Sequence, residues 1–167
     1  MLHPDGTPVS VDGVTLRVAA RGDMPRLWGM QRLAFMELLD RYQDAETNPA
    51  NESLERLMEK FGQPQTTYYF ICSGEEEVGA LRVADARDAQ YRKRISPIFI
   101  LPQQRKKGYA QAAIQTAERI HGAHGWMVDT IAQEAGNCHL YEKLGYVRTD
   151  ATQRINDRMT IIRYIKD

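Results

Sequence analysis

The residues with the clearest chemical potential form a short basic loop, Arg105-Lys106-Lys107-Gly108-Tyr109-Ala110. An apolar run at residues 98–101 precedes this loop, and apolar side chains recur at helical spacing over residues 110–121 after it. The N-terminus of a helix presents unpaired N–H groups and a partial positive charge, which together suit a phosphate group. The order strand, basic loop, helix therefore predicts either a phosphate-binding site or a solvated basic turn that caps an ordinary helix.

The composition of this loop favours a site for a diphosphate that is lined by the backbone. Gly108 allows a positive φ and a close approach of the ligand to the main chain, and Ala110 is small enough to leave room beside the helix end. Arg105, Lys106 and Lys107 supply countercharge. The loop is neither a P-loop nor a dinucleotide fingerprint, because the patterns G-x-x-x-x-G-K-[ST] and G-x-G-x-x-G are both absent.

Periodicity along the rest of the chain indicates the elements that must position this loop. Asn51 or Ser53 can cap the second of the predicted helices. The order β α α β β β α β α β β predicts an α/β fold with a mixed sheet and helices on both faces. We expect one domain over residues 1–167, with residues 1–13 as a loose N-terminal segment. Strands are predicted at residues 14–18, 66–73, 78–84, 98–101, 127–131, 146–148 and 159–165, and helices at residues 24–39, 54–61, 110–121 and 137–144.

Composition narrows the class of protein. The 167 residues are 43% hydrophobic, which is enough for a full core, and 22 basic residues balance 22 acidic ones, so charge indicates neither a nucleic-acid nor a membrane partner. The two cysteines, Cys72 and Cys138, lie far apart and form no metal-binding or disulfide pattern. With no signal peptide at Met1–Ser10 and no apolar run of membrane-spanning length, we expect a cytoplasmic protein without a bound metal.

Two stretches resemble motifs of the GNAT superfamily of acyl-CoA-dependent N-acetyltransferases. The basic loop resembles the R/Q-x-x-G-x-G/A loop of that family, and residues 137–146, NCHLYEKLGY, resemble its N-x-x-L-Y-E-K-L-G-F/Y segment. The resemblance implies a twisted, mostly antiparallel sheet of six to seven strands in which the fourth and fifth strands are parallel and splayed. It also implies acetyl-CoA as co-substrate, a small-molecule or peptide amine as acceptor, and a monomer or homodimer.

The same resemblance assigns the cofactor contacts. Backbone groups of the fourth strand would pair with the pantetheine arm as an added strand would, which requires unpaired groups on that strand. Pro97 removes a ladder donor there, so it marks either a bulge that helps the splay or the point before a strand that starts at Ile98. Backbone N–H groups after Arg105 would hold the pyrophosphate. The implied cofactor-binding residues are Ile98, Phe99, Ile100, Arg105, Lys106, Lys107, Gly108, Tyr109, Ala110, Gln111, Asn137 and Tyr141.

Tyr141 matches the general acid of the family. It lies one turn after Asn137, so both side chains project from the same face of their helix. A tyrosine hydroxyl near the sulfur can protonate the thiolate that leaves when an amine attacks the thioester. The alternatives are contact with the cofactor alone, or a packed aromatic side chain with a satisfied hydroxyl.

The general base departs from the family pattern. Many relatives carry a glutamate on the fourth strand, whereas residues 95–99, ISPIF, contain no carboxylate. Glu134 is the first candidate for the base and Asp85 the second, although an amine can also arrive neutral and need no single base. The missing glutamate leaves open a non-catalytic acyl-CoA-binding regulatory module, and the loop alone leaves open an unrelated binder of phosphate ligands.

The acidic stretch between the first two helices is the candidate acceptor-binding element. Asp44 and Glu46 would suit a cationic amine there, and a solvated loop is the alternative. Cys138 lies in the first turn of a helix, which lowers the pKa of a thiol. A small buried cysteine is nevertheless the favoured interpretation of Cys138, and the four histidines show no spacing typical of a metal site.

Overall fold

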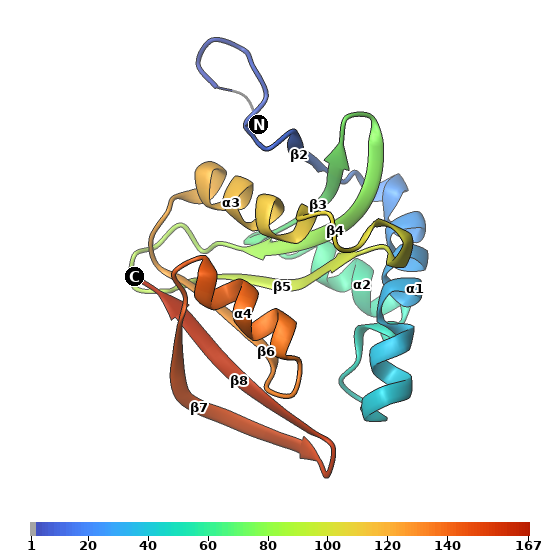
Figure 1. Ribbon diagram of the computed structural model, residues 1–167. Helices are drawn as coiled ribbons and strands as arrows, with labels where there is room; N and C mark the ends of the chain where they lie inside the picture. Colours follow the sequence, from blue (N-terminus) through green and yellow to red (C-terminus); the bar gives the residue numbers. More distant parts are fainter. Residues whose placement is uncertain (1–2) are drawn as a thin grey trace.

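The computed structural model, which describes residues 3–167, contains one eight-stranded mixed sheet with α-helices on both of its faces (Figure 1). The strands are β1 (Ser10–Val11), β2 (Val14–Val18), β3 (Thr66–Ser73), β4 (Glu76–Ala84), β5 (Lys93–Ile100), β6 (Trp126–Ile131), β7 (Val147–Asn156) and β8 (Met159–Lys166). The α-helices are α1 (Met24–Tyr42), α2 (Leu54–Phe61), α3 (Tyr109–His121) and α4 (Ala135–Lys143). The mixed α/β fold predicted from the sequence is confirmed.

The sheet splays between its two parallel strands. The strand order is β1-β2-β3-β4-β5-β6-β8-β7, and every neighbouring pair except β5 and β6 is antiparallel. β5 and β6 pair only where they start, at Lys93 with Trp126 and at Arg94 with Met127. Beyond Arg94 the two strands diverge, so the edge of β5 that faces β6 is left without a strand partner. This V-shaped gap has its vertex at Arg94 and its mouth at Ile100.

A bulge in β5 lies just beyond that vertex. Leu81 pairs with Ile98 and Val83 pairs with Ile95, so Arg82 alone lies opposite both Ser96 and Pro97. Pro97 cannot donate a ladder hydrogen bond, which explains why the irregularity falls at this position. The strand runs from Lys93 through the bulge to Ile100. The alternative of a strand that starts at Ile98 is therefore wrong.

Two apolar cores position the helices on the sheet. On one face α3 and α4 pack against the sheet through a core that includes Ile114, Trp126 and Tyr141. On the other face α1 and α2 bury Leu27 and Leu57 against the sheet. Ser53 begins α2 by accepting a hydrogen bond from the N–H of Arg56 at 3.0 Å, which resolves the choice of capping residue.

Two predicted boundaries and the predicted strand count need correction. The segment expected to be loose contains β1, which pairs with β2, while Met1 and Leu2 lie outside the described residues. This short strand raises the strand count from the expected six or seven to eight. The first helix ends at Tyr42 rather than Leu39, because Tyr42 packs in a small cluster with Ile131 and Met159. Such tertiary contacts override the polar local sequence.

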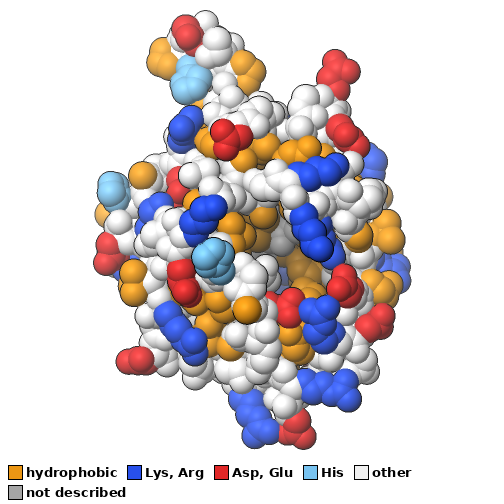
Figure 2. All heavy atoms as spheres, in the orientation of Figure 1, with side chains coloured by type: hydrophobic (Ala, Val, Ile, Leu, Met, Phe, Trp, Pro, Cys, Tyr) orange, Lys and Arg blue, Asp and Glu red, His pale blue; other side chains and the backbone are white. Residues whose placement is uncertain are grey.

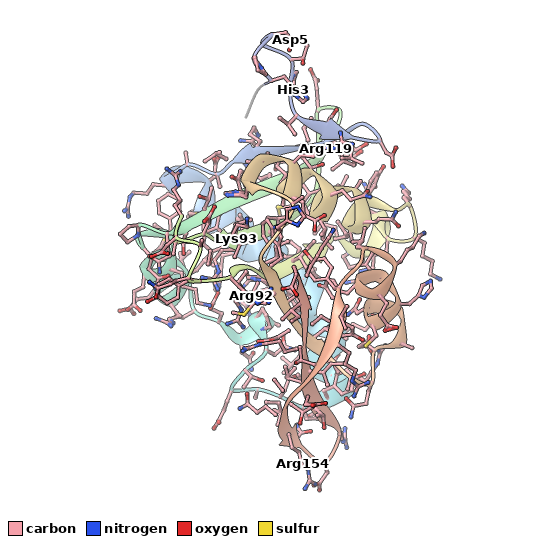
Figure 3. The ribbon with its side chains drawn as sticks, turned by 90° about the vertical axis from the view of Figure 1, so that its left-hand side faces the viewer. His3, Asp5, Arg92, Lys93, Arg119 and Arg154 are labelled. Carbon is pink, nitrogen blue, oxygen red and sulfur yellow. The ribbon has the colours of Figure 1, made fainter. Side chains whose placement is uncertain are left out.

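The last two strands form a longer hairpin than the sequence predicts. β7 continues to Asn156 instead of ending at Arg148, because ladder pairing with β8 holds a strand whose side chains are mostly exposed. Figure 3 shows Arg154 at the tip of this hairpin, at the opposite end of the molecule from His3 and Asp5. Within residues 3–167 no helix has the length and apolar character needed to cross a membrane.

Candidate active site

A cavity of about 390 Å³ lies at the mouth of the gap between β5 and β6. Its walls come from α1, the end of β5, the loop before α3 and the start of α4. Figure 2 shows a hollow on this face with hydrophobic atoms inside it and charged side chains around its rim. All the residues predicted to bind the cofactor line this cavity except Lys107, and both candidate catalytic residues, Tyr141 and Glu134, line it as well.

The loop before α3 presents its backbone to the cavity. Lys106 and Gly108 adopt positive φ values of 65° and 81°, which turns the chain into the first helical residue, Tyr109. The N–H groups of residues 106–111 donate to no protein acceptor in the part of the chain that the structure describes. A helix start leaves its first N–H groups free in this way, and the helix dipole adds positive potential there. The geometry suits an anion at the mouth of the gap.

The basic side chains of the loop have separate roles. Arg105 donates hydrogen bonds to the carbonyl of Ala34 at 2.7 Å, to Glu37 Oε2 at 3.0 Å and to the carbonyl of Ile100 at 3.2 Å. It therefore ties the loop to α1 and is not free countercharge. Lys107 turns away from the cavity, and its Nζ donates to Gln104 Oε1 at 3.1 Å.

Tyr141 and Asn137 form the α4 side of the cavity. Tyr141 is only 6% exposed and packs with edge-on geometry against Tyr146, with ring centroids 5.8 Å apart. Burial, with a smaller contribution from Cys138, raises the pKa of Tyr141 to about 12. The hydroxyl of Tyr141 makes no hydrogen bond to any residue between 3 and 167. It is therefore a protonated donor without a protein acceptor, positioned at the cavity wall.

Glu134 caps the start of α4 and reaches across the cavity to α1. Its two carboxylate oxygens accept hydrogen bonds from Arg41 at 3.0 and 2.9 Å, and Oε2 also accepts one from the hydroxyl of Tyr42. The carboxylate is 21% exposed. Burial, together with the hydrogen bond to Glu134, raises the pKa of Tyr42, so Tyr42 stays a donor. Because a carboxylate has about four lone-pair sites, one site remains for a ligand.

Three of the other sequence candidates lie elsewhere. Asp85 accepts a hydrogen bond from His121 at 2.9 Å, remote from the cavity lining. Asp44 is 5% exposed and accepts from the side chain of Asn48 at 3.1 Å, so its carboxylate stabilises the loop between α1 and α2. Glu46 lines a second hollow of about 490 Å³. The acceptor role of Asp44 and Glu46 stays a prediction.

Sequence reasoning missed the contribution of α1 to the cavity. The C-terminal half of α1 forms one wall of the cavity. The apolar stripe of this helix predicts which side chains face the core, but it does not show that part of the helix faces the gap in the sheet. The spacing of Glu37 and Arg41, which form an i,i+4 ion pair at 2.9 Å, was the available signal. The missed lining residues are Ala34, Phe35, Glu37, Leu38, Arg41, Gln104 and Leu140.

Cys138 is packed against the end of β6 and, within the described residues, is not grouped with the histidines. The Sγ atom of Cys138 lies 3.8 Å from the carbonyl oxygen of Ile131, a weak contact of a largely packed thiol. Among residues 3–167, no group of three His, Cys, Asp or Glu side chains is placed to hold an ion.

Comparison with known families identifies the fold and its class. The family described as "Acetyltransferase (GNAT) family" matches residues 34–146. This protein belongs to the GNAT family of acetyltransferases. The matched residues include the basic loop, β5, β6 and α4, so the cavity described above lies largely within the part of the chain that matches the family. This GNAT protein is an acyltransferase. No protein of curated function matches the sequence.

Solved structures share the fold of this GNAT protein at low sequence identity. The spermidine N-acetyltransferase of Vibrio cholerae in complex with CoA and spermine has a TM-score of 0.71 at 20% identity, over 92% of this chain and 95% of that one. A dodecameric structure of the same Vibrio cholerae enzyme gives 0.68 at 16% identity, over 92% and 93%. The ribosomal-protein-S18-alanine N-acetyltransferase of Escherichia coli gives 0.68 at 13% identity, over 90% and 91%.

Proposed function

We propose that this protein transfers the acetyl group of acetyl-CoA to a primary amine. The observation that carries the proposal is the run of six free N–H groups at residues 106–111, all of which except that of Lys107 belong to residues that line the cavity at the mouth of a splayed sheet. Such a helix start binds a pyrophosphate through its backbone. Family membership supports an acyl-CoA ligand in place of another phosphate compound.

The residues present fit the remaining parts of acetyl-CoA. The free edge of β5 beyond Arg94 offers backbone groups to the amide-bearing pantetheine arm, as a sheet edge does to an added strand. With the pyrophosphate at the mouth, the arm runs along β5 toward the vertex. The thioester then lies near the bulge at Pro97, within the part of the gap that Tyr141 borders.

Tyr141 is the proposed general acid. The amine nitrogen forms a bond to the acyl carbon, the bond from that carbon to sulfur breaks, and the thiolate takes the proton of the Tyr141 hydroxyl. A pKa of about 12 keeps this hydroxyl protonated at neutral pH, so the donor is available before the sulfur develops charge.

Glu134 is the proposed base for the acceptor amine. It is the less exposed of the two carboxylates that line the cavity, at 21% against 61% for Glu37. Arg41 and Tyr42 hold it in one orientation, and its remaining lone-pair site can take the amine proton directly or through a water. Asp85 is not proposed for this role because His121 occupies it outside the cavity lining.

The experiment combines cofactor binding with turnover. Calorimetric titration with CoA is expected to show binding that Gly108→Val weakens, because a β-branched residue is strained at a φ of 81° and crowds the free N–H groups. Thiol release from acetyl-CoA is then measured with a panel of amines. Binding of CoA without acetylation of any amine would contradict the proposal.

A further inference from the structure

A row of polar side chains crosses the sheet at the vertex of the gap, on the face that α1 and α2 share. Register places Arg82 on β4 opposite Tyr68 on β3, both on this face, and Asp129 on β6 opposite Arg163 on β8. Arg94, on β5, lies between them, and its guanidinium donates to Asp129 Oδ2 at 3.0 Å. We call Arg82, Arg94, Asp129 and Arg163 the arginine row.

The arginine row contains more positive charge than the protein neutralises. Asp129 is shared by two cations, because Arg163 also donates to it at 2.8 and 3.1 Å. Arg82 has no carboxylate within ion-pair distance among residues 3–167, and its one hydrogen bond goes from Nε to the carbonyl of Ser96. Burial lowers the pKa of this guanidinium from its ordinary value. A half-buried cation without a counterion is costly, so the unpaired end of Arg82 calls for an anionic partner.

Two neighbouring atoms point to a missing polar ligand at the same place. The hydroxyl of Tyr68, a residue that is 2% exposed, has no hydrogen-bond partner in the described chain, and neither does Nε of Arg94. Buried polar atoms are nearly always satisfied. Tyr68 on β3 and Arg94 on β5 lie on the strands that flank Arg82, so the two orphaned donors belong to the same row as the unpaired guanidinium.

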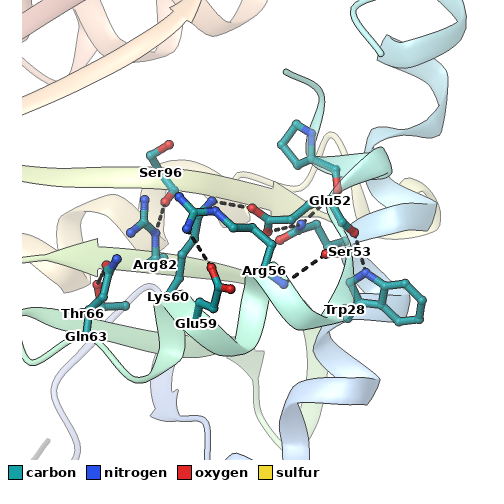
Figure 4. Close-up of polar contacts among 12 residues, drawn as sticks. Trp28, Glu52, Ser53, Arg56, Glu59, Lys60, Gln63, Thr66, Arg82 and Ser96 are labelled. Carbon is teal, nitrogen blue, oxygen red and sulfur yellow. Dashed lines mark hydrogen bonds and ion pairs between the residues drawn. The ribbon is translucent and has the colours of Figure 1, made fainter. Parts of the chain in front are cut away.

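A hollow lies beside this face of the vertex and reaches Ser96, whose carbonyl accepts the hydrogen bond from Arg82, while Arg82 itself does not line the hollow. It has a volume of about 490 Å³ and lies between the bulge at Ser96 and Pro97 and the α2 side chains Arg56 and Lys60. Figure 4 shows Arg82 bonded to Ser96 beside the side chains of α2. Of the two acidic residues that line it, Glu52 is already engaged by Lys60 and by Gln31 Nε2 at 3.1 Å, and Glu46 is exposed. The hollow has the size of a small-molecule site.

We infer that the acceptor is a small amine that also bears a carboxylate, and that Arg82 binds this carboxylate. The inference rests on the proposed function, because it takes the thioester to lie near Pro97, at the same bulge that Arg82 contacts through Ser96. A guanidinium fork matches a carboxylate in shape and charge. The acceptor class is then that of amino acids and related amino carboxylates, which differs from the cationic amine suggested by the acidic residues Asp44 and Glu46.

The test measures thiol release from acetyl-CoA with matched acceptors. Each L-amino acid is compared with its α-amide and with the amine that lacks the carboxylate, and spermidine and an aminoalkyl phosphate complete the panel. Losing one charge-assisted hydrogen bond costs a factor of roughly 10 to 100. We therefore expect kcat/KM for the amino acids to exceed that for the matching amides by this factor, and the aminoalkyl phosphate to be a weaker substrate.

Variants separate recognition from folding and from cofactor binding. Arg82→Gln is expected to raise KM for the amino carboxylate by roughly 10-fold or more, and to leave both KM for the amide and CoA affinity unchanged. Arg82→Lys should restore part of the effect. Arg154→Gln removes an equal charge at the hairpin tip and is the control. If Arg82→Gln misfolds in circular dichroism, the comparison of acid with amide in the unaltered protein still decides.

The outcomes distinguish the inference from the function on which it rests. Equal turnover of acids and amides, or a preference for spermidine, overturns the inference and leaves the acetyltransferase intact. A preference for the aminoalkyl phosphate overturns the carboxylate assignment. CoA binding without acetylation of any amine overturns the proposed function, and the inference with it.

Discussion

The two ends of the gap between β5 and β6 are built from different parts of the chain. At the mouth, six consecutive residues, 106–111, have free backbone N–H groups, and all of them except Lys107 line the cavity. At the vertex, side chains from β3, β4, β5, β6 and β8 form one polar row that contains Arg82. Backbone groups recognise what every acyl-CoA has in common, whereas a set of side chains can be specific to one acceptor. In the functions proposed above, the mouth therefore serves the family chemistry, and the vertex serves what is particular to this protein.

Charge follows the same division. At the mouth, Arg105, Glu37, Arg41 and Glu134 form alternating ion pairs, so the rim is close to neutral. At the vertex, Arg94 and Arg163 share Asp129, and Arg82 has no carboxylate within ion-pair distance among residues 3–167. A neutral rim suits a ligand whose phosphates are held by the backbone, and a surplus of positive charge suits a ligand whose anionic group must be selected.

The largest effect should come from Tyr141, the proposed general acid at the mouth. Tyr141→Phe is expected to lower kcat by roughly 10²- to 10⁴-fold and to leave the Kd of CoA unchanged, because only the proton donor is removed. Since the neutral form is the donor and its pKa is about 12, Tyr141 itself causes no loss of rate between pH 7 and pH 10. Stopped assays of thiol release and calorimetry measure the two quantities.

Tyr109→Phe is the matched control, because Tyr109 lines the same cavity without a proposed chemical role. An unchanged kcat in Tyr141→Phe would show that Tyr141 is not the general acid and that its contribution at the mouth is limited to binding.

A smaller effect is expected at Glu134, where the mouth meets the acceptor. Glu134→Gln should lower kcat by about 10²-fold at pH 7. The deficit should shrink toward pH 10, because an amine with a pKa near 10 then loses its proton to water without help. The pH profile of kcat for both proteins measures this convergence.

Arg41→Gln separates the base from the link between α1 and α4. It breaks the ion pair with Glu134 but keeps the carboxylate. A loss of rate that is equal in Arg41→Gln and Glu134→Gln, and independent of pH, would show that Glu134 only holds α1 over the cavity.

The division between mouth and vertex also explains what the sequence could predict. The loop, Asn137 and Tyr141 lie within two short stretches whose spacing is local, so their convergence followed from strand and helix periodicity together with the family motifs. Even there, the local pattern suggested countercharge for Arg105, which instead bonds to Ala34, 71 residues away. The sequence left two alternatives at Pro97, a bulge within the strand or a strand that starts at Ile98, because proline is compatible with both.

The vertex could not be predicted from a single sequence. Arg82, Arg94 and Arg163 read as charged positions in half-exposed strands, and nothing local shows that Asp129 is shared or that Arg82 is left unpaired. That information resides in the register of strands far apart in the chain. The end of α1 was missed for the same reason, since Tyr42 is helical through its contacts with Ile131 and Met159.

A third region, on the face of the sheet that α3 covers and opposite the arginine row, tests whether buried polar contacts there affect only stability. Tyr69, His121 and Asp85 form a hydrogen-bonded chain with both distances 2.9 Å. Asp85→Asn is expected to lower the free energy of unfolding by about 1–3 kcal/mol at pH 7 and to leave kcat unchanged. Urea denaturation and thiol release measure the two.

The pH dependence of that stabilisation has a defined sign. Burial alone would raise the pKa of Asp85, but the hydrogen bonds from His121 and from the N–H of Arg87 prevail and lower it below 3.8. A lowered pKa stabilises the fold above the unfolded value and loses this effect as the pH falls. The difference in the free energy of unfolding between the unaltered protein and Asp85→Asn should therefore decrease below about pH 4. A lower kcat in Asp85→Asn with an unchanged free energy of unfolding would make Asp85 a candidate for the general base again.

The smallest effect should come from the basic side chains of the loop, and it tests most directly whether the backbone holds the pyrophosphate. Lys106 lines the cavity and Lys107 does not, so the two neighbours are matched in type and differ in position. Lys106→Gln is expected to weaken CoA binding by only about 2- to 5-fold at low salt, and Lys107→Gln not at all, because exposed charges contribute little and are screened. Calorimetry at two ionic strengths measures both. A loss of about 100-fold in Lys106→Gln would mean that a side chain binds the pyrophosphate, and the contrast between a mouth built of backbone and a vertex built of side chains would fail.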